Sequence, residues 1–151
     1  VSVGTIVLGL PAGLALGAAF GTVSALSAFG IVGAPSALAA ALVSASPVLA
    51  ILLCYVPRLL IPVFVYGTYR IATRKNAQSK RAISYAAAAG SLCNTVFYLG
   101  LMLLFYVILG INSESVLAAI GGTGLIAGGS EAIVAVLIVT PVTLAIQKIK
   151  K

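Results

Sequence analysis

Histidine, aspartate and tryptophan are absent from the 151-residue sequence, and only two acidic side chains are present. Without histidine, and with so few carboxylates, the chain lacks the side chains that form metal clusters and hydrolase triads. General acid–base catalysis also needs a tunable histidine or a carboxylate pair, whereas Glu114 and Glu131 are far apart in the sequence. We therefore predict that the chain is not an enzyme and holds no metal and no cofactor.

Cysteine is scarce as well. Cys54 and Cys93 lie within apolar runs, and the chain contains no C-x-x-C motif. A free thiol in such surroundings behaves as a small hydrophobic side chain. We expect both cysteines to be buried packing residues, because the spacing typical of metal or redox sites is missing.

Charged residues make up only 7% of the chain, whereas 62% is hydrophobic and the mean hydropathy is +1.22. A soluble domain carries about 25% charged residues. Several stretches here reach the roughly 20 apolar residues that are needed to span a bilayer. The sequence therefore predicts an all-α polytopic membrane protein in which residues 1–151 form a single transmembrane helical bundle domain.

The positive charges indicate an orientation in the membrane. All but one of the nine basic residues fall at 70–81 or at 148–151. The positive-inside rule places such clusters in the cytoplasm, where they contact anionic lipid. We therefore expect a multi-pass protein of the cell membrane, with the loop at 72–82 and the C-terminus cytoplasmic, and we expect no nucleic-acid partner.

Interruptions in the apolar pattern divide the chain into spans. We predict loops on the outer side at 30–46 and 112–129, where glycine, serine and proline are frequent. Ser130 is expected to cap the last helix, with Glu131 in its first turn. The predicted helices cover 11–29, 47–71, 83–111 and 130–146.

The beginning of the sequence suggests one further span. Residues 1–10 are apolar but too short to cross a bilayer alone, so we interpret them as the end of an inward-running helix. A bundle with both termini inside has an even number of spans. We therefore expect six transmembrane helices in the full protein, the first of which precedes Val1.

Gly13, Gly17 and Gly21 form a stripe of small residues at helical spacing. Such a stripe lets the backbone of a second helix approach closely. Two interpretations remain open from the sequence: the stripe packs against another helix of the same bundle, or it docks onto a separate subunit.

Arg58 lies in the middle of the apolar run 47–66. A guanidinium at membrane depth is costly and faces a partner, a ligand or a wet cavity. Because Pro57 and Pro62 each remove a backbone hydrogen bond, they free carbonyls and favour a kink near Arg58. A planar donor fork suits a carboxylate or a phosphate, so we predict a site for a small anion, with Tyr55 as part of its wall.

A polar stripe on the next helix is expected to face Arg58. Both Arg58 and Asn94 lie about 16 Å from the end of their helix, at a rise of about 1.5 Å per residue. The same helix face carries Ser91, Thr95 and Tyr98. These residues either bind the ligand together with Arg58 or act as interhelical hydrogen-bonding groups. A rival arrangement pairs Arg58 with Glu131 in an ion pair.

Four segments carry a family resemblance. They are Leu8-Gly-Leu-Pro-Ala-Gly13 with its continuation to Gly21, Val56-Pro-Arg58-Leu-Leu, Gly90-Ser-Leu-Cys-Asn94-Thr95, and Glu131-Ala-Ile-Val. In this order the chain resembles, over essentially its whole length, the S components of energy-coupling factor (ECF) vitamin transporters. The pantothenate branch is the most similar.

The resemblance implies a six-helix subunit that captures its vitamin from outside. It also implies docking, through small-residue faces such as Gly13, Gly17 and Gly21, onto a transmembrane coupling subunit driven by two cytoplasmic ATPases. The chain itself has no G-x-x-x-x-G-K-[ST] motif for ATP. Pantothenate offers a carboxylate, an amide and hydroxyls. The ligand contacts implied are Arg58, Asn94, Thr95, Tyr98, Ser91, Tyr55 and Glu131.

Other interpretations remain open at this stage. The vitamin could be hydroxymethylpyrimidine, pyridoxine or niacin in place of pantothenate. Alternatively, Arg58, Asn94 and Glu131 could form a closed internal network in a structural or assembly subunit that binds no ligand.

Overall fold

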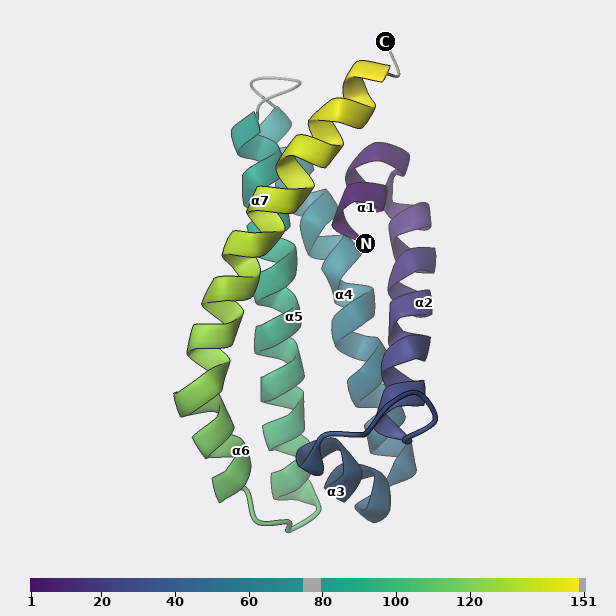
Figure 1. Cartoon of the computed structure of the whole chain (residues 1–151), viewed down its shortest axis with the longest axis vertical. Coiled ribbons are helices and arrows are strands. Elements are labelled where there is room, and N and C mark those ends of the chain that lie inside the picture. Colours follow the sequence, from purple (N-terminus) through teal and green to yellow (C-terminus); the bar gives the residue numbers. More distant parts are fainter. Residues whose placement is uncertain (75–79, 150–151) are drawn as a thin grey trace.

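The computed structural model describes residues 1–74 and 80–149, and every regular element within these ranges is helical. The predicted all-α class is therefore confirmed. Lys75, Lys150 and Lys151 of the predicted basic clusters lie outside the described residues. The elements, drawn in Figure 1, are α1 (Ser2–Leu8), α2 (Leu10–Ala28), α3 (Ala37–Ala45), α4 (Pro47–Thr73), α5 (Lys80–Ile108), α6 (Glu114–Ala119), the π-helical turn η1 (Ile120–Gly124) and α7 (Leu125–Ile149).

Within the described ranges, four helices are long and apolar enough to cross a membrane: α2, α4, α5 and the part of α7 from Gly128 to Ile149. Their positions agree with the four spans predicted from the sequence, and the chain is a membrane-embedded helical protein. The total of six spans and the cytoplasmic side of the bundle remain predictions.

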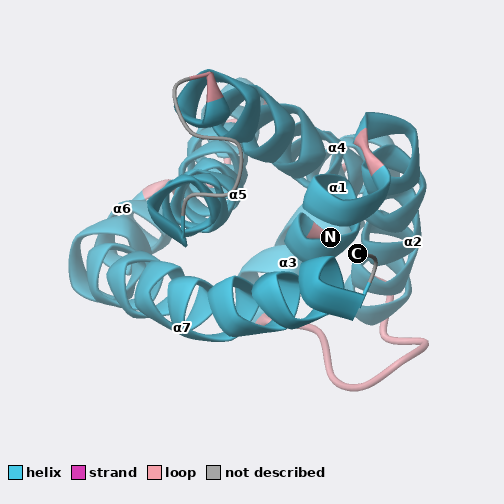
Figure 2. Ribbon diagram, turned by 90° about the horizontal axis from the view of Figure 1, so that it is seen from above, coloured by secondary structure: helices cyan, strands magenta, loops and turns pink. Residues whose placement is uncertain are grey.

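The helices form a ring. α2 packs against α4, α4 against α5, and α5 against α7, while α1 contacts both α7 and α2 and so completes the circle. Figure 2 shows this arrangement along the bundle axis. The turn between α1 and α2 is at Gly9, whose φ of 91° favours glycine. The described basic residues Arg70, Arg74, Lys80, Arg81 and Lys148 lie near the helix ends opposite α3 (Figure 1).

The segment 30–46, predicted as a loop, contains the nine-residue helix α3, so this prediction was wrong for 37–45. Two serines explain the local fold. The Ser36 side chain accepts a hydrogen bond from the Ala39 N–H at 3.2 Å, and Ser46 accepts one from the Leu49 N–H at 3.5 Å. They cap α3 and α4, and Pro47 suits the first turn of α4 because its missing N–H has no helical partner there.

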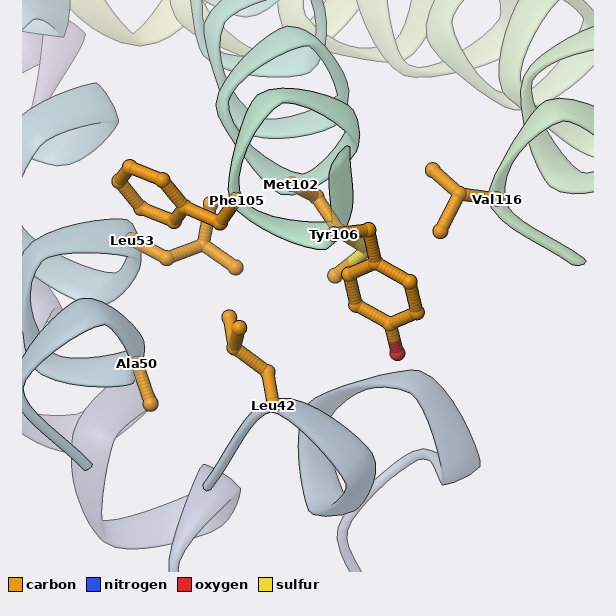
Figure 3. Packing of buried hydrophobic residues seen from close by; sticks show 7 residues of the cluster. All are labelled: Leu42, Ala50, Leu53, Met102, Phe105, Tyr106 and Val116. Atoms are coloured by element: carbon orange, nitrogen blue, oxygen red, sulfur yellow. The ribbon is translucent and has the colours of Figure 1, made fainter. Parts of the chain in front are cut away.

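Helix α3 closes one end of the bundle. Leu42 is fully buried and projects toward α4 and α5, and the Tyr106 hydroxyl donates a hydrogen bond to the Leu38 carbonyl at 2.7 Å (Figure 3). This end, called the α3 end below, contains the larger buried cluster, formed by Leu42, Ala50, Leu53, Met102, Phe105, Tyr106 and Val116.

The outer loop predicted at 112–129 was also wrong, because α6, η1 and the first turn of α7 occupy most of it. Ser130 and Glu131 consequently lie inside α7 and do not form its N-terminus. Packing explains why the helix continues through glycine: a methyl group added at Gly128 would lie 2.9 Å from Cγ2 of Thr95. Glycine lets α7 approach α5 here, and this tertiary contact overrides its low helix propensity.

The glycine stripe of α2 packs inside the bundle. Gly13, Gly17 and Gly21 are all buried. Methyl groups added at these positions would meet Pro62, the Arg58 carbonyl oxygen and Tyr55, at 2.8, 2.7 and 2.9 Å respectively. Of the two interpretations of this stripe, packing within the chain describes the structure, because α4 covers the face that a separate subunit would need.

Candidate functional site

Two prolines of α4, Pro57 and Pro62, leave backbone carbonyl groups near Arg58 without their helical hydrogen-bond donors. Pro57 has no N–H, so the carbonyl of Leu53, four residues earlier, loses its helical donor. The Arg58 Nη1 donates a hydrogen bond to this carbonyl at 3.2 Å. Pro62 frees the Arg58 carbonyl in the same way, and Gly17 of α2 approaches that oxygen. The arginine side chain therefore folds back along its own helix toward the α3 end.

The guanidinium of Arg58 lies between two aromatic rings. Its Cζ is 4.6 Å from the ring centroid of Tyr98 on α5 and 5.5 Å from that of Phe20 on α2. Both distances are within the range of cation–π attraction. The Nε atom is buried and has no hydrogen-bond partner in the described part of the chain. The guanidinium therefore contacts two rings and donates one hydrogen bond to a carbonyl, and its Nε–H has no acceptor in the described structure.

Arg58 lines a cavity of about 340 Å³ at the α3 end, called the Arg58 cavity. It reaches the surface beside Ala34 and Pro35, which are exposed in the segment before α3. The described residues of its wall include polar groups that sequence reasoning did not assign to a site, namely Ser24 and Ser27 of α2. The whole described lining is Ser24, Ser27, Ala28, Ala34, Pro35, Ser36, Ala39, Leu42, Ala50, Leu53, Cys54, Arg58 and Tyr98.

A second cavity, of about 470 Å³, is lined by two of the other predicted polar residues and is called the Asn94 cavity. Asn94 and Ser91 line it from α5, and the Asn94 Oδ1 is buried without a hydrogen-bond partner in the described structure. The remaining described residues of its wall come from α1, α2, α4, α5 and α7: Val1, Ser2, Leu16, Phe20, Ile61, Ala87, Gly90 and Ala135. Arg58 and Asn94, predicted to meet, therefore line different cavities.

The predicted polar stripe on α5 divides into three environments. Tyr98 lies in the Arg58 cavity, and Ser91 and Asn94 lie in the Asn94 cavity. Thr95 faces α7, where its hydroxyl donates to the Glu131 carboxylate at 3.3 Å. Depth along the helix suggested a single site, but Asn94 and Tyr98, one turn apart on α5, line different cavities.

Two other predicted site residues also have partners outside the cavities. Tyr55 shares a hydrogen bond of 2.8 Å with Thr22 at the α2–α4 contact. Glu131 is exposed on α7, and the described structure contains no ion pair between it and Arg58. Phe20 is a further residue near Arg58 that the sequence analysis did not identify, because an aromatic side chain in an apolar span carries no distinguishing signal.

Cys54 and Cys93 are buried and free, as expected of packing residues. Cys54 forms part of the Arg58 cavity wall.

No family model, no curated protein and no solved structure matches this chain. What the cavities can bind must therefore be inferred from their own residues. The described walls of the two cavities contain one cationic side chain, several hydroxyls and no carboxylate.

Proposed function

We propose that the chain captures a small organic acid in the Arg58 cavity, as the substrate-binding S component of an ECF-type vitamin transporter with pantothenate as its ligand. The observation that carries the proposal is a guanidinium at membrane depth that lines a cavity and has no carboxylate partner in the described structure. A charge in this position is expensive unless something compensates it. A carboxylate supplies that compensation.

The surroundings of the guanidinium favour an anion with hydroxyl or amide groups. The rings of Tyr98 and Phe20 lie within cation–π distance of the guanidinium, and Nη1 donates to the Leu53 carbonyl, so the other Nη is the group of the fork that an acceptor in the cavity would use. Ser24 and Ser27 supply hydroxyls in the same wall. The volume of about 340 Å³ lies within the range of small-molecule sites, about 300–1,000 Å³.

Charge also separates the candidate vitamins. Pantothenate and niacin are carboxylic acids, whereas hydroxymethylpyrimidine and pyridoxine carry no carboxylate. An arginine fork favours the two acids because each N–H bond to a charged acceptor is worth about 1.5–3 kcal/mol. Between them, the hydroxyls of the cavity favour pantothenate.

Capture in this cavity requires partners for transport. The chain has no nucleotide-binding motif, so uptake would depend on a coupling subunit and its two ATPases. The glycine stripe of α2 is covered by α4, and docking would therefore use another face of the bundle.

The test is binding of radiolabelled pantothenate to the purified chain in lipid nanodiscs. We expect Arg58→Ala to weaken binding at least 100-fold, about 2.7 kcal/mol. Arg58→Lys should restore only part of it, because an ammonium lacks the planar fork. Arg70→Ala is the matched control, since Arg70 also stacks on a ring, that of Tyr66 at 5.6 Å, but lies near the opposite end of α4.

Two results would contradict the proposal. One is the absence of binding of pantothenate and of the other three vitamins to the wild-type chain, which would favour a structural subunit. The other is unchanged pantothenate affinity in Arg58→Ala.

A further inference from the structure

We propose that a groove between α5 and α7 holds one anionic phospholipid, with part of an acyl chain between the two helices and the phosphate against Arg81 in the first turn of α5. Lipid surrounds any membrane-embedded bundle, and this groove is a place on the surface where one lipid is bound. Its described lining shares no residue with the Arg58 cavity or the Asn94 cavity. The lipid site is therefore independent of the proposed function.

The groove lies where α5 and α7 pack together (Figure 1) and has a volume of about 250 Å³. Its described lining is wholly apolar and consists of Ala88, Ala132, Ile133, Val136 and Leu137. Ala132 is buried, whereas Ile133 and Leu137 are exposed, so the larger side chains form a rim around the small one. The volume is below the roughly 300–1,000 Å³ of small-molecule sites. It suits a section of one acyl chain better than a compact ligand.

A hydrogen bond fixes one end of the groove. The hydroxyls of Ser84 on α5 and Thr140 on α7 share a hydrogen bond of 3.0 Å. Ser84 is one turn before Ala88, and Thr140 is one turn after Val136. The bond therefore joins the two helices directly beyond the groove, on the side of the basic helix ends. Such hydrogen bonds hold helices together in a membrane, so the groove is built into the packing of α5 against α7.

Arg81 supplies the charge for a headgroup. It is exposed and lies seven residues before Ala88. Seven residues are about two helical turns, so both residues lie on the same face of α5, separated by about 10 Å along its axis. Tyr85, which is 62% exposed, lies between them, and tyrosine is enriched at membrane–water interfaces. A cation, an interfacial ring and an apolar groove thus follow one another in the order of the phosphate, glycerol and acyl chain of a phospholipid.

The first turn of α5 favours an anionic headgroup over a zwitterionic one. The helix begins with Lys80 and Arg81 and has no acidic residue in its first turn. The helix dipole is positive at this end, so cations there are unfavourable and a negative group is favourable. The phosphate of phosphatidylglycerol compensates these charges. Phosphatidylcholine compensates them less, because its headgroup carries a cation of its own.

The first experiment measures which lipid lies at the groove. The chain has no tryptophan, so Leu137→Trp places a single reporter on the rim, and Ile133→Trp provides a second one. In phosphatidylcholine bilayers, brominated phosphatidylglycerol should quench these reporters with an affinity about fivefold above that of brominated phosphatidylcholine, the factor expected from one basic residue near a membrane surface.

Val63→Trp on α4 is the matched control for the reporter position. Val63 is 45% exposed and lies seven residues before Arg70, the spacing that separates Arg81 from Ala88, but it is not among the described residues of the groove. The preference for phosphatidylglycerol should be about twofold at most there, because this surface offers a charge without a groove.

Two variants in the Leu137→Trp background separate the parts of the site. Arg81→Ala should lower the affinity ratio of the two lipids to about one, whereas Arg70→Ala, its control at the same end of the bundle, should leave it unchanged. Ala88→Leu fills the groove and should abolish the preference although Arg81 is intact. Gly100→Leu is its control on α5, at a position where an added methyl group meets nothing within 4 Å.

Three results would overturn the lipid site. Equal affinity ratios at the rim and at Val63→Trp would show only a general attraction of anionic lipid to the basic end. A preference that persists in Arg81→Ala would mean that this residue does not hold the headgroup. A preference that persists in Ala88→Leu would mean that the groove does not hold the acyl chain. No vitamin is present in these measurements, so each of these results leaves the proposed function unaffected.

Discussion

The α3 end of the bundle and the half that contains the Asn94 cavity differ in how they treat buried polar groups. At the α3 end, the buried Tyr106 hydroxyl bonds to the Leu38 carbonyl, and seven buried residues form one apolar cluster. In the other half, the buried cluster consists of Ile61, Val65 and Ala86. In this half, the acceptors Asn94 Oδ1, Thr143 Oγ1 and Gln147 Oε1 are buried with no partner in the described structure, whereas the donor Arg58 Nε, which is also buried without a partner, lies next to the α3 end.

This difference shows where the chain is rigid and where it keeps unused capacity for binding. Dense packing and satisfied hydrogen bonds fix α3, α4 and α5 relative to one another. Arg58 lies next to this packed end, since Leu53 is both a member of the cluster and the acceptor of its hydrogen bond. The three unpaired acceptors lie in the half with the smaller buried cluster.

The largest effect on stability is expected at Leu42, the side chain that α3 inserts between α4 and α5. Leu42→Ala should leave a cavity and cost about 2–5 kcal/mol. In a chain of this size that corresponds to a fall in Tm of roughly 5–15 °C, measured by thermal unfolding in detergent. Leu104→Ala is the control, because Leu104 is half exposed on α5. Equal falls in Tm would show that the α3 end is not the packed core.

A smaller effect is expected at the α2–α4 contact. A methyl group at Gly17 would lie 2.7 Å from the Arg58 carbonyl oxygen, and this neighbour is backbone that cannot rotate away. Gly17→Ala should therefore cost about 1–3 kcal/mol by overpacking. It should also weaken pantothenate binding, since α4 carries Arg58.

The control for Gly17→Ala is Gly100→Ala on α5, where an added methyl group meets nothing within 4 Å. There alanine should stabilise the helix by up to about 1 kcal/mol through its better propensity. Opposite signs for the two substitutions in the same thermal assay are the expected result. A loss of equal size at both positions would mean that the interface can shift to accommodate a side chain.

The sequence predicted the four described spans and drew attention to Arg58 because both depend on local chemistry. An apolar run of membrane length is visible without knowledge of the fold, and so is a guanidinium between Pro57 and Pro62. The helical segments α3, α6, η1 and the first turn of α7 were missed because their local signals are weak. Helix α3 is a short alanine-rich segment whose signal is the Ser36 cap, and the start of α7 continues through glycines that only the contact with Thr95 explains.

The division into two cavities could not be predicted from the sequence. A rise per residue gives the depth of Asn94 but not which side of Arg58 it faces. That side depends on how α5 is rotated against α4, the helix that it packs on, and a rise per residue does not give this rotation. The contact of Phe20 on α2 with the guanidinium, 5.5 Å from its ring centroid to the Arg58 Cζ, also depends on this tertiary packing.

The smallest effects are expected at two buried hydroxyls, one with a hydrogen-bond partner and one without a partner in the described structure. Tyr106→Phe removes the donor to the Leu38 carbonyl and should cost about 0.5–1.5 kcal/mol, a fall in Tm of a few degrees. Thr143 is fully buried in α7 and its Oγ1 has no partner in the described structure. Thr143→Val exchanges this hydroxyl for a methyl group of similar shape, so the desolvation cost disappears and Tm should stay constant or rise. A clear fall in Tm for Thr143→Val would mean that the hydroxyl is hydrogen-bonded in the folded protein, and the contrast between the two halves of the bundle would no longer hold.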